Sequence, residues 1–490
     1  MASGSSSTRA VMPLLVGTGG SFLAALVSTA IVARLYPPTA FGELAAFLGW
    51  VAVPAAVGSL RLADAIPLTR TLEDEARVIR GAVEAGALVS LGGGLLVLIA
   101  HAAGALMVPG TLAPPFVLGF GFTWSLAMAR IGTMLATKRG WFAWLAVSNL
   151  ALPIGTLCGQ LACYCLGGTL IEGAAAGSLL AAVPALLLLA RGPRICTDRG
   201  IVFFSAHAMF PEFGRFSIPF AVLSALRVRS PYVLMTLTAS GLTLAQAGML
   251  QQAERITSWP RTALSAILRP IFHHAATSDP NQAAARAVGT AALLLAAATG
   301  PVAWCILNAD LVIRVALGPG WEGAIVPFQI LIGPAVAFTA ADFTDRLFDM
   351  QRRQGVLLVL EGSACVITAG GAYCFAVVWP SLPLLAAMMG VAMLLYSIAV
   401  LVLLAQASPR QALRACPLLA TGAMGGPLVA VVQALSGGAL GPHGGAAVAG
   451  LVAGALALNT LRRALAGLRG VRDSSSPAPP QQEAERQQST

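Results

Sequence analysis

The run FSIPFAVLSALRVRSPYVLMTLTA, residues 216–239, shows the pattern that decides the fold, because mostly apolar residues surround Arg227 and Arg229. A run of about 20 apolar residues is long enough to cross a bilayer as a helix. A charged side chain near mid-bilayer is costly unless it faces protein or water, so such arginines are candidates for a functional site. We therefore predict a membrane-spanning helix with two arginines near mid-depth.

Similar runs recur along the whole chain of 490 residues, and the composition agrees with them. The mean hydropathy is +0.80, and only 10% of residues are charged, whereas soluble domains carry roughly 25%. The chain is predicted to be an all-α polytopic membrane protein with about 14 transmembrane helices. These spans are expected near residues 12–33, 41–66, 81–107, 114–137, 140–165, 168–190, 216–239, 244–272, 287–313, 322–350, 356–378, 381–405, 416–435 and 444–461.

The distribution of lysine and arginine predicts the orientation of these spans. Basic residues concentrate in cytoplasmic loops, and with the N-terminus inside, the outside segments hold only Arg34 and Arg314. We therefore expect both termini to be cytoplasmic and assign the net charge of +10 to orientation. Nucleic-acid binding is not indicated, because no basic face with stacking aromatic residues is present. Seven arginines fall within spans: Arg61, Arg130, Arg227, Arg229, Arg255, Arg261 and Arg346.

The order of runs and polar stretches predicts two lobes and an appendage. We expect a disordered N-terminus (1–10), an N-lobe of six helices (11–190), a cytoplasmic linker (191–215) and a C-lobe of six helices (216–405). Two further helices (416–461) and a basic, then disordered, cytoplasmic tail (462–490) follow. A shift of 206 residues superimposes Gly42 on Gly248, Pro54 on Pro260 and Ser59 on Ser265. Such a repeat is typical of parallel halves related by an axis along the membrane normal, with the substrate site between them.

Three arginines approach the midplane: Arg227 and Arg229 in the seventh span and Arg255 in the eighth. Residues two apart on a helix point about 200° apart, so Arg227 and Arg229 face one direction only if Pro231 distorts the helix. We expect at least one of them to line a central cavity that binds an anion. The alternative is a buried pair that bridges neighbouring helices. Arg255 is not expected to pair with the adjacent Glu254.

The remaining span arginines have further interpretations. Arg61 lies three residues before Asp64, and Arg346 lies four after Asp342 and three before Asp349, spacings that suit ion pairs on one helix. These sets are either structural ion pairs or part of a cytoplasmic gate or ion-coupling site. Arg130 and Arg261 either line the cationic cavity or extend toward the membrane–water interface.

Motifs for covalent chemistry and metal binding are missing from the sequence. No Walker loop, HExxH or GxSxG motif is present, and the eight cysteines have no metal-ligand spacing. We therefore expect a protein that is not an enzyme and that has no cofactor and no metal.

Two motifs carry a family resemblance: ARLYPPTAFG at residues 33–42 and SLRLADAIPL at residues 59–68. They resemble the "RLxxPxxFG" and "LRxxxAIPL" patterns of the polysaccharide-biosynthesis flippases, the O-antigen and capsule repeat-unit translocases of the multidrug/oligosaccharidyl-lipid/polysaccharide exporter superfamily. Gly248 to Pro260 and GPGW at residues 318–321 also match, and the resemblance spans about residues 11–405.

The resemblance implies two pseudo-symmetric six-helix lobes plus two C-terminal helices in the bacterial inner membrane. It implies a flippase that moves an undecaprenyl-pyrophosphate-linked oligosaccharide by alternating access, for lipopolysaccharide O-antigen or exopolysaccharide biosynthesis. Membrane lipid, a polysaccharide polymerase and a chain-length regulator are the implied partners. The cationic site would comprise Arg227, Arg229, Arg255, Arg261 and Arg130, and the gate or ion-coupling site Arg61, Asp64, Glu254, Asp342 and Arg346.

Three other functions remain open from the sequence. A peptidoglycan-precursor flippase would also need a cationic cavity. A multidrug or cation antiporter of the same superfamily would be expected to line its cavity with acidic residues, which are outnumbered here. A membrane glycan polymerase usually has long outside loops, whereas the outside loops predicted here are short.

Overall fold

The computed structural model describes residues 4–106, 112–190, 202–211, 213–237, 240–261, 280–342, 344, 347–348 and 353–405. Within these ranges every regular element is helical, and nine helices are long and apolar enough to cross a membrane. The all-α membrane architecture is therefore confirmed. The spans expected at 416–435 and 444–461, and the tail at 462–490, lie outside the described residues.

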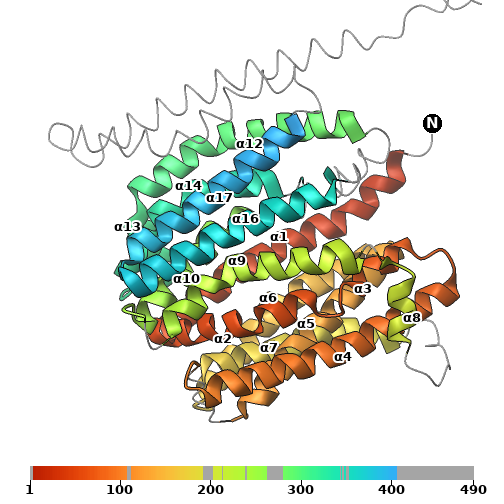
Figure 1. Ribbon diagram of the computed structural model, residues 1–490, viewed down its shortest axis with the longest axis horizontal. Coiled ribbons are helices and arrows are strands. Elements are labelled where there is room, and N and C mark those ends of the chain that lie inside the picture. Colours follow the sequence, from red (N-terminus) through yellow and green to blue (C-terminus); the bar gives the residue numbers. More distant parts are fainter. Residues whose placement is uncertain are drawn as a thin grey trace, which may run out of the picture. The chain divides into compact units, whose positions relative to one another are not determined.

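The first half of the chain forms long helices in the predicted order (Figure 1). The helix α4 begins well before residue 81, where a span was expected, because the Thr71 side chain caps it by accepting a hydrogen bond from the Asp74 N–H at 3.1 Å. Likewise α1 begins at Gly4, where disorder was expected, since serine is well tolerated in a first helical turn. The elements are α1 (Gly4–Leu35), α2 (Pro38–Val57), α3 (Leu62–Ala65), η1 (Ile66–Leu68), α4 (Leu72–Ala102), α5 (Pro115–Lys138), α6 (Phe142–Cys165) and α7 (Leu170–Ala190).

The described part of the second half is also built of helices. Contacts divide the chain into two compact units, residues 1–280 with 308–400 and residues 281–307 with 401–490. The site described below lies wholly in the first unit. The elements are α8 (Phe203–Ala208), η2 (Phe213–Ser217), α9 (Ile218–Thr236), α10 (Leu244–Thr257), α12 (Pro280–Leu307), α13 (Ala309–Leu317), η3 (Glu322–Ala324), α14 (Ile325–Asp342), α16 (Gln354–Tyr373), η4 (Cys374–Val378) and α17 (Leu382–Ala405).

The two halves meet where α2 crosses α10, at the pair of glycines that the internal repeat makes equivalent. A Cβ atom on Gly42 would lie 1.9 Å from the carbonyl oxygen of Leu244, and one on Gly248 would lie 2.0 Å from that of Pro38. Positions 38 and 244 differ by 206, as do 42 and 248, so the contact is reciprocal. Reciprocity of this kind is the mark of a two-fold relation. It accords with the predicted pseudo-symmetry of the halves.

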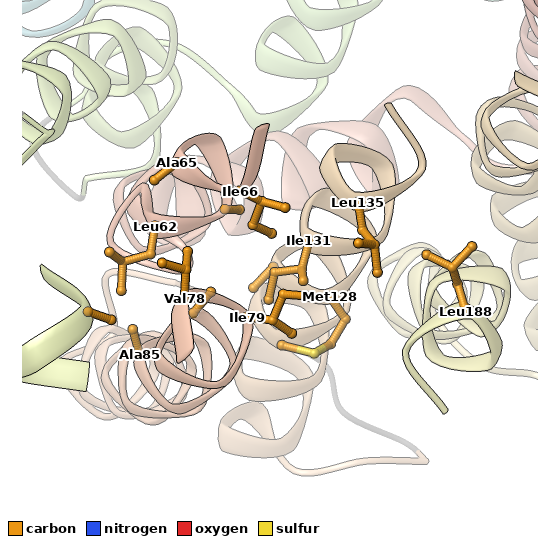
Figure 2. Packing of buried hydrophobic residues seen from close by; sticks show 14 of the residues in the cluster. Leu62, Ala65, Ile66, Val78, Ile79, Ala85, Met128, Ile131, Leu135 and Leu188 are labelled. Carbon is orange, nitrogen blue, oxygen red and sulfur yellow. The ribbon is translucent and has the colours of Figure 1, made fainter. Parts of the chain in front are cut away.

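A dense apolar cluster fixes the segment that follows α2. Figure 2 shows Leu62 and Ile66 of this segment packed among Val78 of α4 and Ile131 of α5. Leu62, Ile66, Val78 and Ile131 are all fully buried. The segment between α2 and α4 is thus held against the α4–α5 pair, and this holds the charged residues beside it in place.

We predict that Gly42→Ala and Gly248→Ala each lower the stability of the protein by about 1–3 kcal/mol, the usual cost of overpacking a tight contact. Each added methyl group would overlap a backbone oxygen that cannot turn away as a side chain can. The measurement is thermal unfolding of the purified protein in detergent.

Gly19→Ala is the matched control, because nothing lies within 4 Å of a Cβ atom there. It should leave the stability of the protein unchanged or slightly raised, since alanine has a higher helix propensity than glycine. Equal effects at positions 19, 42 and 248 would contradict the close crossing.

Candidate functional site

A cavity of about 370 Å³ lies between α2, α5 and α9. Most of its wall is apolar, and its charged groups are three guanidinium groups, from α5, from α9 and from the turn after α2. The polar lining residues are Arg61, Arg130, Ser224 and Arg229. A wall of this kind, largely apolar with a few convergent polar groups, is typical of a ligand site.

Arg61 reaches the cavity from an unusual turn after α2. The residues Leu60 and Arg61 have φ angles of 48° and 64°, in the left-handed region. Neither is glycine, and such a conformation costs on the order of 1–3 kcal/mol, so it persists only when the surroundings enforce it. Here the buried segment that follows the turn supplies that support. The turn leaves the Arg61 Nε 2.8 Å from Asp64 Oδ2.

Asp64 joins Arg61 to Arg130 on α5. The Arg130 Nε and Nη2 donate hydrogen bonds of 2.9–3.0 Å to the two Asp64 oxygens. The Asp64 side chain is only 3% exposed, whereas that of Arg130 is 34% exposed. A guanidinium group has five N–H donors, so Arg130 keeps donors for a ligand while Asp64 holds its orientation. The charged residues that line the cavity are all arginines, and Asp64 binds two of them.

Arg229 supplies the third cationic group of the cavity. Within the described part of the chain it makes no ion pair, and its guanidinium lies 5.8 Å from the centre of the Tyr232 ring. The buried Tyr232 hydroxyl in turn donates a hydrogen bond to Glu254 on α10. Arg229 is thus linked to α10 through the ring of Tyr232, and its charge faces the cavity without an acidic partner.

Arg227 does not share this role, and we withdraw it from the predicted anion site. Its Nε donates to Glu361 Oε1 on α16 at 2.7 Å, and both side chains are at least 95% buried. The guanidinium also lies 4.8 Å from the Phe338 ring centre and 5.6 Å from that of Tyr396. The helix α9 runs through Pro231 without ending, so residues two apart point to different neighbours. Arg227 thus forms a buried pair between helices, the alternative that the sequence left open.

Arg261 is also paired, and it brings a partner to Asp342 that the sequence did not predict. Its Nη2 donates to Asp342 Oδ1 at 2.8 Å, and its guanidinium lies 4.7 Å from the Phe338 ring centre. Phe338 therefore contacts two guanidinium groups, those of Arg227 and Arg261. Arg346, which was expected to pair with Asp342, lies outside the described residues, as does Asp349.

Arg255 lies apart from the cavity-lining set. It is half-buried on α10, and no described residue forms an ion pair with it. The cavity wall includes no residue of α10. The predicted group of five cavity arginines therefore divides into Arg130 and Arg229 at the cavity, Arg227 and Arg261 in ion pairs, and Arg255 elsewhere on α10.

Two acidic residues important to this arrangement were missed at the sequence level. Glu361 is the only acidic residue in the apolar run 356–378, and an unexplained acid in a span is a signal for a buried cation nearby. Glu75, whose side chain is 3% exposed, binds Lys138 at 2.7 Å and Arg139 at 2.6 Å. Those two residues were assigned to orientation alone, whereas they also tie α5 to α4. Among described residues, no group of three His, Cys, Asp or Glu could hold a metal ion.

Comparison with solved structures identifies the fold. The structure titled "Lipid II flippase MurJ, inward closed conformation" has a TM-score of 0.67 at 11% identity, covering 92% of this chain and 99% of that chain. A MOP superfamily transporter from Pyrococcus furiosus has a TM-score of 0.53 at 16% identity, covering 81% and 94%. The chain shares the fold of these two solved structures. A MATE in complex with MaD5 shares it, with a TM-score of 0.51 at 16% identity, covering 84% and 95%.

This likeness confirms the predicted all-α membrane fold class. No protein-family model matches the sequence, and no curated protein sequence matches it.

We predict that Asp64→Asn destabilises the protein by about 3 kcal/mol, the lower part of the range for breaking a buried ion pair, because Arg130 keeps some access to water. The change leaves Arg61 and Arg130 close together without the carboxylate between them. Thermal unfolding in detergent measures it.

The control is Asp310→Asn, whose pair with Arg314 at 2.8 Å is more than half exposed on both sides. Exposed pairs of this kind contribute about 0–1 kcal/mol. If both substitutions had the same small effect, Asp64 would not be the anchor of the two arginines.

A double substitution tests whether Arg227 is structural. Glu361→Gln alone should destabilise by about 3–5 kcal/mol, because it leaves Arg227 as an uncompensated buried charge. Arg227→Gln with Glu361→Gln should recover part of that loss and retain transport. Thermal unfolding and transport are measured for the single and double variants. A double variant that is stable but does not transport would show that Arg227 belongs to the ligand site.

Proposed function

We propose that this protein is a flippase that moves undecaprenyl-pyrophosphate-linked oligosaccharide repeat units across the bacterial inner membrane. The observation that carries the proposal is the cavity wall, where Arg61, Arg130 and Arg229 converge within a MOP fold. The transport would proceed by alternating access and serve surface polysaccharide synthesis.

The chemistry of the cavity suits a phosphorylated head group. A pyrophosphate that leaves water needs replacement donors, and guanidinium groups provide charge-assisted, bidentate hydrogen bonds to phosphate oxygens. Arg229 offers a charge that forms no ion pair with a described residue, while Arg130 offers donors that its bond to Asp64 leaves free. The apolar remainder of the wall would tolerate a polyprenyl chain at the edge of the cavity, with most of that chain left in lipid.

A second candidate is a flippase for a peptidoglycan precursor. The observation in its favour is the similarity to a structure titled as a lipid II flippase, over 99% of that chain. The cavity charge does not separate the two substrates, because the cationic groups would meet a phosphorylated head group in both. A drug or cation antiporter is disfavoured, because cations would be repelled by a cavity whose lining charges are all arginines.

Arg229→Gln should reduce surface polysaccharide at least tenfold in a bacterial strain that lacks its own repeat-unit flippase and expresses this chain. The reason is loss of the one cavity charge that has no carboxylate partner among described residues. Arg229→Lys should retain part of the activity, since it keeps the positive charge but loses the planar guanidinium group that forms bidentate hydrogen bonds. Surface polysaccharide is measured by gel and by antibody binding to intact cells.

Arg77→Gln is the control, because Arg77 lies away from the cavity and pairs with the exposed Glu73 at 3.1 Å. It should transport as the wild type does. The same set is tested in a strain depleted of its peptidoglycan-precursor flippase. Rescue of growth there, without rescue of surface polysaccharide, would replace the first proposal by the second. Normal transport by Arg229→Gln at wild-type abundance would reject the cationic cavity for both.

A further inference from the structure

Two motif stretches that are far apart in the sequence touch each other in the folded chain. Residues 33–42 cover the end of α1 and the start of α2, and residues 315–321 cover the end of α13 and the loop before η3. Hydrogen bonds connect the two stretches across 281 and 288 residues of sequence. Two of the motifs that carried the family resemblance, residues 33–42 and 318–321, therefore meet in one contact between the two halves, which we call the latch.

Trp321 is the buried centre of the latch. Its side chain is 1% exposed, and its indole Nε1 donates a hydrogen bond of 3.0 Å to the carbonyl oxygen of Ala33. The ring meets Phe41 edge to face, with centroids 5.1 Å apart, an arrangement that aromatic pairs favour. One side chain from the second half thus binds both the last turn of α1 and the first turn of α2.

Arg34 forms the outer part of the latch. Its Nη1 donates to the Ala30 carbonyl at 2.7 Å within α1, and its Nη2 donates to the Val315 carbonyl at 2.9 Å on α13. Gly318 has a φ of +96°, and a Cβ atom there would lie 3.1 Å from Arg34 Cγ. Glycine is therefore needed at position 318 both for the backbone conformation and for space.

The latch and the glycine crossing lie at the same end of α2, and the cavity lies further along that helix. Phe41 of the latch directly precedes Gly42 of the crossing, whereas the α2 residues that line the cavity begin at Leu48. The two halves are thus joined at the start of α2 and leave a cavity beside its later turns. Under the predicted orientation, the joined end is the outer one.

We propose that the latch is the device that keeps the outer end of the cavity closed, and that its release exposes the cavity to the outside. Its hydrogen bonds between halves are few, and both use backbone carbonyl acceptors, so they can break and re-form without leaving a charge unpaired. Loss of one such bond should shift a closed-to-open equilibrium about fivefold, the ratio expected for one net hydrogen bond. The inference rests on the proposed transport function, because a gate is useful only if the cavity carries a substrate. Its test needs no substrate.

The test measures access to Ser224, which lines the cavity. Ser224→Cys is introduced into a chain whose eight native cysteines are replaced, and a membrane-impermeant thiol reagent is added outside intact cells. We expect slow labelling with the latch intact. Trp321→Phe keeps a six-membered aromatic ring beside Phe41 but removes the indole N–H donor and the five-membered ring, and it should raise the labelling rate at least about fivefold. Arg34→Gln should act in the same direction.

Trp379→Phe is the matched control, because Trp379 is 66% exposed and lies outside the latch. It should label at the original rate. If Trp321→Phe lowers the amount of protein in the membrane, the labelling rate of Arg34→Gln is used as the test instead. Unchanged labelling in both latch variants, or an equal rise in Trp379→Phe, would overturn the proposal. Faster labelling together with no phosphorylated-lipid transport would keep the latch and reject the proposed function instead.

Discussion

The rule that a charge inside a bilayer needs a partner or water organises this structure more than any other constraint. Each half satisfies it differently. In the first half, Asp64 holds two arginines at the edge of a cavity. In the second half, Arg227 and Arg261 are each matched with one acid and share the ring of Phe338. Among the span arginines that the structure describes, Arg229 in the cavity and Arg255 on α10 remain outside these pairings.

The difference between the two kinds of arginine is one of energy. A buried pair such as Arg227 with Glu361 does little for net stability, because desolvation offsets most of the attraction, yet loss of either partner is severe. Such a pair joins α9 to α16 and has no spare charge for a ligand. Asp64 is instead shared by two cations that both retain access to the cavity. The first arrangement holds helices together, and the second holds donors in position.

The sequence predicted well whatever depends on local pattern. Apolar length predicted the helices, and the spacing of Arg61 and Asp64 predicted their ion pair. The pair forms, but across the left-handed turn at Arg61 and not along one helix. Pairs between helices were beyond such reasoning, because Arg227 and Glu361 are 134 residues apart. The same holds for Arg130, whose position in a span said nothing about Asp64. Interhelical pairing follows from how the helices pack, which periodicity within one helix does not contain.

The reciprocal contact of Gly42 and Gly248 has a consequence for how the chain could be rebuilt. Gly42 contacts Leu244, and Gly248 contacts Pro38, which is the position equivalent to Leu244. Two copies of the first half therefore carry the surfaces needed to form this contact with each other. Such a dimer would contain two copies of the Arg61, Asp64 and Arg130 group but neither Arg229 nor the Arg227 pair. The crossing is thus a property that the halves share, whereas the charge of the cavity depends on how they have diverged. The chain thus combines a symmetric helix crossing with a cavity whose charged residues are not symmetric.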